Sequence, residues 1–154
     1  STIVRYPELT DLVEALTEIA QEEMKHFGMV LERIKERGFT LGYERKDDYV
    51  ADLAKFIKRG GSREEQLVDR LLFAAMIEAR SCERFRMLSE KIEDAALAEF
   101  YRELMISEAG HYTTFIGFAR KYGGNVNVDE RWQQFLDHEA EVIQNYGKKE
   151  TMHG

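Results

Sequence analysis

Two Glu-x-x-His pairs provide side chains that could bind metal ions. Glu23 precedes His26 by three positions, and Glu108 precedes His111 by the same spacing. An α-helix turns by about 100° per residue, so side chains three positions apart share a face and can bind one ion together. A further carboxylate, Glu78, lies on the apolar face of a predicted helix between the pairs. Pairs of this kind, with additional glutamates, form two-metal sites in helical bundles.

In a glutamate-rich chain, the Glu-x-x-His spacing alone is weak evidence of a metal site. Glu150 and His153 form a third such pair in the C-terminal tail, and we interpret that pair as coincidence. The first two pairs differ because they lie on apolar helix faces, where a carboxylate costs several kcal/mol unless it is paired or bound to a metal. Two interpretations follow: a metal site, or a structural network in which the glutamates pair with histidines and arginines.

Neighbouring residues compete for the same roles. Glu22 falls off the apolar face that Glu23 shares, and Glu83 lies about 140° around the helix from Glu78, so we expect Glu83 beside the site or at the surface. Cys82 is on the inward side of its helix and is expected to be a small buried side chain. Carboxylates combined with imidazole favour iron or manganese over zinc or copper.

The elements that must position these residues are all helices. The chain contains one proline, and its apolar residues recur at close to 3.6 positions, which predicts an all-α fold in a single domain, 1–154. A capping box at Ser62 and Glu65 marks one helix start, and Asp94 is a plausible cap for the next helix. The predicted helices cover approximately residues 7–38, 47–59, 62–92, 95–122 and 129–146.

The loops between these helices predict how the long ones are arranged. About 25 residues separate the first and second long helices, which predicts a crossover and a parallel course for the two. The next connection is short and centres near Glu93, so Glu78 and Glu108 should face each other at one level. For the last helix we predict that Trp132, Leu136, Ala140 and Ile143 form the packed side.

Composition limits the class of protein. The chain has no run of 18 or more apolar residues, no signal-peptide pattern and a single cysteine, which together predict a soluble, cytoplasmic protein that does not enter membranes. Its net charge of −7 argues against bulk attraction to nucleic acid. Residues 33–63 nevertheless carry nine Lys or Arg against five Asp or Glu, and this basic stretch could meet a phosphate backbone.

Three segments together resemble a known family. Residues 77–85 read IEARSCERF, residues 22–26 read EEMKH, and residues 107–112 read SEAGHY. In this order and spacing they resemble the MiaE-type tRNA hydroxylases of the ferritin-like superfamily, over nearly the whole chain. The resemblance implies a ferritin-like four-helix bundle with a crossover helix and an additional C-terminal helix.

The resemblance also implies a reaction. MiaE-type enzymes use a non-haem di-iron centre and O₂ to hydroxylate the isopentenyl group of a 2-methylthio-isopentenyl-adenosine in tRNA. This chain would then bind two Fe ions, or Mn, and would need tRNA and an external electron donor, such as a reductase. Its iron ligands would be Glu23, His26, Glu78, Glu108 and His111. The alternatives are a ferritin-like metal-binding or iron-handling protein without an organic substrate, and a plain helical interaction module.

Two expectations concern what lies around the site. In the family, a further long helix precedes the one that begins near Pro7 and supplies another glutamate ligand, whereas residues 1–6 resemble only the end of that helix. We therefore expect the native protein to extend before Ser1. Contacts to RNA phosphates are expected from basic residues near the crossover, since such contacts position a substrate without reading its sequence: Lys55, Lys58, Arg59 and Arg63.

Overall fold

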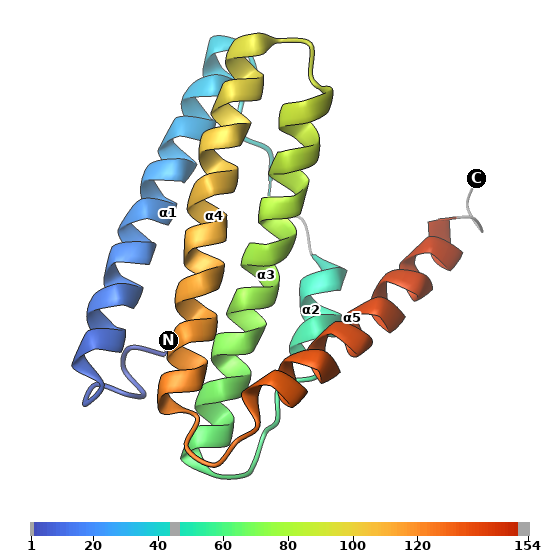
Figure 1. Cartoon of the computed structure of the whole chain (residues 1–154). Coiled ribbons are helices and arrows are strands. Elements are labelled where there is room, and N and C mark those ends of the chain that lie inside the picture. Colours follow the sequence, from blue (N-terminus) through green and yellow to red (C-terminus); the bar gives the residue numbers. More distant parts are fainter. Residues whose placement is uncertain (1, 44–46, 151–154) are drawn as a thin grey trace. The chain divides into compact units, whose positions relative to one another are not determined.

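The computed structural model describes residues 2–43 and 47–150, with the side chains of 146–150 left out. Within this part, all regular secondary structure is α-helical, which confirms the predicted all-α fold (Figure 1). The Glu150 and His153 pair lies outside the described side chains. The helices are α1 (Thr10–Glu36), α2 (Asp48–Ala54), α3 (Arg63–Lys91), α4 (Ala95–Tyr122) and α5 (Val128–Glu150).

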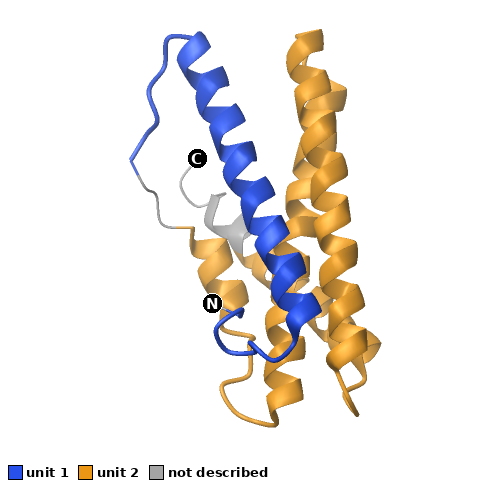
Figure 2. Cartoon of the chain, turned by 90° about the vertical axis from the view of Figure 1, so that its left-hand side faces the viewer, with its two compact units in different colours: residues 1–46 blue, residues 47–154 orange. Residues whose placement is uncertain are grey.

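The helices belong to two compact units, residues 1–46 and residues 47–154 (Figure 2). The first unit contains α1, and the second contains α2, α3, α4 and α5. The single domain predicted for 1–154, and the parallel course predicted for the two long helices on either side of the crossover, stay predictions.

Helix α1 begins later than its proline suggests. Pro7 lies in a turn in which the Leu9 N–H donates to the Tyr6 carbonyl, and the helix starts at Thr10. Its C-terminal end agrees with the sequence prediction, because Gly38 adopts a φ of +75° just beyond the last helical residue. Glycine occupies this left-handed conformation without the steric cost of a Cβ, so it ends helices readily.

Helices α3 and α4 form an antiparallel pair joined by residues 92–94, and they lie side by side along their length (Figure 1). The predicted capping box starts α3: the Glu65 N–H donates to Ser62 Oγ, and the Ser62 N–H donates to the Glu65 carboxylate. Asp94 caps α4 by accepting from the Leu97 N–H. These local bonds set where both helices begin, and so set the register that places residues of α3 opposite residues of α4.

Helix α5 packs against α2 and α3 with a different face from the predicted one (Figure 1). Phe135 and Glu139 are fully buried, whereas Ile143 is 45% exposed, so the predicted packing side of this helix was wrong. The reason is that two charged residues of α5, Arg131 and Glu139, are buried and pair with residues of α3, which a hydrophobic pattern does not reveal. The helix also continues through Gly147 to Glu150, since glycine inside a helix costs only about 1 kcal/mol.

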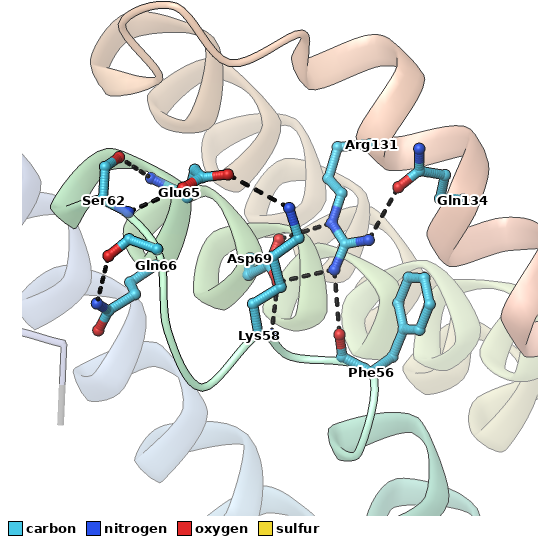
Figure 3. Close-up of polar contacts among 9 residues, drawn as sticks. Phe56, Lys58, Ser62, Glu65, Gln66, Asp69, Arg131 and Gln134 are labelled. Carbon is cyan, nitrogen blue, oxygen red and sulfur yellow. Dashed lines mark hydrogen bonds and ion pairs between the residues drawn. The ribbon is translucent and has the colours of Figure 1, made fainter.

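One of these buried partnerships joins α3 to α5 through Asp69 and Arg131 (Figure 3). The Arg131 guanidinium donates to both carboxylate oxygens at 2.7 and 2.8 Å, and to the Phe56 carbonyl at 3.1 Å. The Lys58 N–H donates to the same carboxylate at 2.8 Å. Because these bonds satisfy the backbone after α2, that helix ends at Ala54, five residues before the predicted end.

A second buried carboxylate, Glu139 on α5, joins α3 and α2. Arg80 donates to both of its oxygens and also pairs with Glu83. The Tyr49 hydroxyl donates to Glu139 at 2.6 Å. Burial, followed by the neighbouring Glu139 carboxylate, raises the pKa of the Tyr49 phenol above its ordinary value, and hydrogen bonds to Glu139 raise the pKa of Arg80.

The raised pKa of Tyr49 predicts a stability difference at alkaline pH. The folded protein holds the phenol proton more tightly than the unfolded chain, so this stabilisation is present below pH 10.0, the ordinary pKa, and declines as the pH rises above it. The free energy of unfolding should therefore fall more steeply above about pH 10 in the wild type than in Tyr49→Phe, measured by urea denaturation between about pH 8 and 11. Tyr43→Phe, at a fully exposed phenol, is the control and should follow the wild type.

Membrane-spanning helices are not found among the described residues: each helix there is too short or too polar to cross a bilayer.

Candidate metal centre

Helices α3 and α4 bring together three of the predicted metal ligands, Glu78, Glu108 and His111. Each offers an oxygen or nitrogen atom that lies within 4.8 Å of the corresponding atoms of the others. The His111 Nδ1 is 3.8 Å from the Glu78 Oε2. The antiparallel pairing about a turn near Glu93 therefore places Glu78 and Glu108 at one level, as the sequence predicted.

These donors are held inside the protein. Glu108 is 5% exposed and His111 is 4% exposed, while the Glu78 side chain is 14% exposed. Two carboxylates at this depth repel each other and lose their hydration, and a divalent cation between them would offset both costs. Two hard oxygen donors and one imidazole suit Fe²⁺ or Mn²⁺, so the donor set fits the metals that the sequence indicates.

The two sides of the His111 ring differ in their neighbours. Its Nδ1 faces the Glu78 carboxylate, whereas its Nε2 lies 3.5 Å from the Ser107 hydroxyl. A metal-bound histidine commonly has its second ring nitrogen hydrogen-bonded, which sets the ring orientation. This arrangement makes Nδ1 the nitrogen suited to bind an ion, with Ser107 one helical turn away beside Nε2.

Helix α1 carries the other predicted pair, Glu23 and His26. Its helical geometry brings the two side chains together as the spacing requires, with the His26 Nδ1 3.6 Å from the Glu23 Oε1. Helix α1 belongs to the first compact unit, and the donors on α3 and α4 belong to the second. The assignment of all five residues to one metal site therefore stays a prediction.

Two residues of α3 near the donors were assigned subsidiary roles from the sequence. Glu83 pairs with Arg80 at the surface, which is one of the two positions expected for it. Cys82 is half-buried and not fully enclosed as expected. Burial, and then the nearby Glu108 carboxylate, raise the pKa of its thiol, which favours the neutral form.

The basic residues predicted to bind RNA phosphates lie near the start of α3. Lys55 pairs with Asp52, and the Lys58 ammonium pairs with Glu65 at 3.3 Å. Arg59 precedes the helix, and Arg63 is its first residue. Arg63 lies 15 residues before Glu78, which is about 22 Å along the helix. These side chains are too far from the metal donors to contact the nucleotide that reacts, so any phosphates that they bind belong to a more distant part of the RNA. Their role in RNA binding stays a prediction.

The sequence analysis missed the buried ion pairs that hold α5 against α3. Asp69 is 2% exposed and Glu139 is 1% exposed, and both accept hydrogen bonds from an arginine on another helix. One signal was available, since both acidic residues fall on a face with apolar residues three or four positions away. Their partners could not be identified in this way, because those lie 62 and 59 residues away in the chain.

A family model and two curated proteins that match this chain all belong to one family of enzymes. The family model described as tRNA-(MS2IO6A)-hydroxylase (MiaE) matches residues 1–154. The tRNA 2-(methylsulfanyl)-N(6)-isopentenyladenosine(37) hydroxylase of Pseudomonas putida is 33% identical over 153 residues, which cover 99% of this chain and 73% of that protein. The protein of the same name from Salmonella typhimurium is 30% identical over 132 residues, 86% of this chain and 47% of that protein.

A solved structure resembles the chain as well. Protein 43 from Synechococcus, described as having aldehyde deformylating oxygenase activity, superposes with a TM-score of 0.83 and 34% identity. The match covers 92% of this chain and 69% of that one. The helical fold is therefore shared with an oxygenase, and the curated hydroxylases are longer than the part of them that this chain spans.

Proposed function

The chain belongs to the MiaE family of tRNA hydroxylases, and from this membership we propose that it hydroxylates the isopentenyl group of 2-methylsulfanyl-N6-isopentenyladenosine in tRNA. The observation that carries the proposal is the cluster of Glu78, Glu108 and His111 inside the protein. An oxygenase of this family needs a metal centre, and the cluster supplies donors of the right chemistry at the level where α3 and α4 face each other. A cytoplasmic location, where tRNA is modified, is part of the same proposal.

We propose that two iron ions bind here, with manganese as the alternative metal. The ligands would be the three donors of α3 and α4 together with Glu23 and His26 of α1. When bound, a reduced iron pair would supply O₂ activation, in which one oxygen atom is inserted into a C–H bond of the substrate and the other is released as water, with two electrons from an external donor and two protons from solvent.

The contributions of the chain follow from its geometry. The carboxylates of Glu78 and Glu108 would supply the negative charge that attracts and holds cations, and His111 presents its Nδ1 toward Glu78. Burial of these groups keeps bulk water away, which strengthens their electrostatic interaction with an ion and protects a reactive centre from side reactions. The long α3 and α4 helices make the donor positions rigid, because each donor lies well inside its helix.

An assay with a defined RNA tests the proposal. The iron-loaded protein is given a chemical reductant, O₂ and an anticodon stem-loop that carries the prenylated nucleoside, and the digested RNA is analysed by mass spectrometry. We expect one added oxygen atom on the isopentenyl group, dependent on iron and O₂. An RNA with unmodified adenosine is the control.

The iron content and the RNA product together separate the three classes of function considered. If the protein takes up iron but leaves the prenylated RNA unchanged, an iron-handling role without an organic substrate would replace the hydroxylase. Less than about one iron per chain after anaerobic reconstitution would instead favour a helical module without a metal centre.

A further inference from the structure

A hollow of about 280 Å³ lies between α3 and α5, and we propose that it receives the isopentenyl group of the tRNA substrate. This inference rests on the proposed function and adds to it the place where the substrate binds. The lining consists of four apolar or weakly polar side chains and three charged ones: Met76, Ala79, Cys82 and Leu136, with Arg80, Glu83 and Arg86.

The position of the hollow on α3 links it to the metal donors. Cys82 lies four residues after Glu78, one helical turn along nearly the same face, and Ala79 directly follows Glu78. A group in the hollow therefore lies beside the turn of α3 that carries Glu78. The hydroxylation proposed above requires such closeness, because the reacting carbon must approach the metal centre.

The lining matches the chemistry of a prenyl group. Its apolar part is larger than its polar part, and a branched five-carbon chain gains free energy when it leaves water for such surroundings. At about 30 Å³ of liquid volume per water, the hollow is comparable to several solvent molecules, so it offers room for a side chain of this size. It is open to solvent, so a base extruded from an RNA loop could enter without unfolding the protein.

Two of the lining residues, Arg80 and Arg86, carry positive charge that complements an RNA backbone. Arg80 is held in place by Glu139 and Glu83, whereas Arg86 forms no salt bridge with a carboxylate of the described residues. Arg86 is eight residues, or about 12 Å along the helix, from Glu78. This is nearer than the basic cluster at the start of α3, so Arg86 is the better placed cation for a phosphate next to the modified nucleotide.

The single cysteine gives a direct test on the unmodified chain. Cys82 is the sole cysteine, so its alkylation by iodoacetamide reports on the hollow alone. The iron-loaded protein without reductant is saturated with an anticodon stem-loop carrying the prenylated nucleoside, or with the same RNA carrying unmodified adenosine. We expect the prenylated RNA to slow alkylation at least about fivefold more than the unmodified RNA. Equal protection by both RNAs would overturn the proposal.

Variants test the same inference by affinity. The wild type should bind the prenylated RNA at least about tenfold more tightly than the unmodified RNA, from the apolar transfer of the prenyl carbons. Ala79→Phe fills the hollow and should remove most of this preference, while Ala96→Phe, at an exposed position of α4, should keep it. Ala79→Met is a smaller filling in case the phenylalanine disturbs folding, which circular dichroism would reveal. An unchanged preference in the filled variants would overturn the proposal.

The contribution of Arg86 is tested separately from that of the apolar lining. Arg86→Gln should weaken binding of both RNAs by a similar factor and flatten the dependence of affinity on salt concentration, whereas the exposed Arg102→Gln should not. Unchanged salt dependence in Arg86→Gln would remove Arg86 from the proposed site. These readouts need no turnover, so a failure of RNA discrimination is distinguishable from a failure of hydroxylation, which the oxygen-insertion assay measures.

Discussion

Replacing Glu108 by alanine should abolish iron loading and hydroxylation while leaving the metal-free fold intact. Loss of a residue that merely supports a metal ligand costs about 10–100-fold in affinity or activity, so loss of a ligand should exceed 100-fold. The metal-free variant should be at least as stable as the metal-free wild type, because a carboxylate that is 5% exposed carries a desolvation cost that alanine lacks. Iron content after anaerobic reconstitution and thermal melts with and without iron measure both effects.

The matched control is Glu103→Ala, which removes an exposed carboxylate from the same helix. Iron should raise the melting temperature of the wild type and of Glu103→Ala, since a ligand that binds only the folded state stabilises it. It should not raise that of Glu108→Ala. Strong destabilisation of metal-free Glu108→Ala would contradict the metal interpretation, and would favour a structural network in which Glu108 pairs with other side chains.

Replacing Asp69 by leucine should destabilise the protein by about 3–5 kcal/mol, because it leaves the Arg131 guanidinium buried without its partner. The pair is among the most enclosed charges described, with side-chain exposures of 10% for Arg131 and 2% for Asp69. Loss of Asp69 also removes the acceptor of the Lys58 N–H after α2. Urea denaturation of metal-free protein, with the midpoint and slope compared between variants, measures the free energy of unfolding.

A surface pair of the same chemistry is the control. Arg120 and Asp129 are also 2.7 Å apart, yet their side chains are 61% and 76% exposed. Water and salt screen such a pair, so Asp129→Leu should leave the free energy of unfolding within the error of the measurement. If both substitutions had equal effects, burial would not be the cause of the stabilisation by Asp69.

A double variant separates the charge pair from its surroundings. Asp69→Leu combined with Arg131→Met replaces the pair by apolar side chains of similar volume, and it should recover most of the stability that Asp69→Leu loses. If the double variant stayed as unstable as Asp69→Leu, the main stabilising contribution would come from the bonds of Arg131 to Phe56 and of Lys58 to Asp69. These bonds organise the chain after α2.

Features set by neighbours in the chain could be predicted from the sequence. The starts of α3 and α4 follow from side chains that cap backbone groups within three residues, as at Ser62 and Asp94. The level match between Glu78 and Glu108 follows from a short turn between two helices of constant rise. For the same reason the pairing of Glu23 with His26 on α1, and the closeness of Glu108 to His111 on α4, could be predicted from their spacing, since helical geometry repeats regularly.

Only the tertiary structure decided which face of α5 is buried and where α2 ends. Apolar periodicity pointed to Leu136 and Ile143, yet Arg131 and Glu139 are enclosed instead. A buried charge is stable only beside its partner, and the partners on α3 are 62 and 59 residues distant in the chain. The sequence by itself thus determined where α3 and α4 begin and the level at which Glu78 and Glu108 meet, because local geometry suffices for both. The docking of α5, and with it the hollow beside Cys82, depended on ion pairs that exist only once the helices have packed.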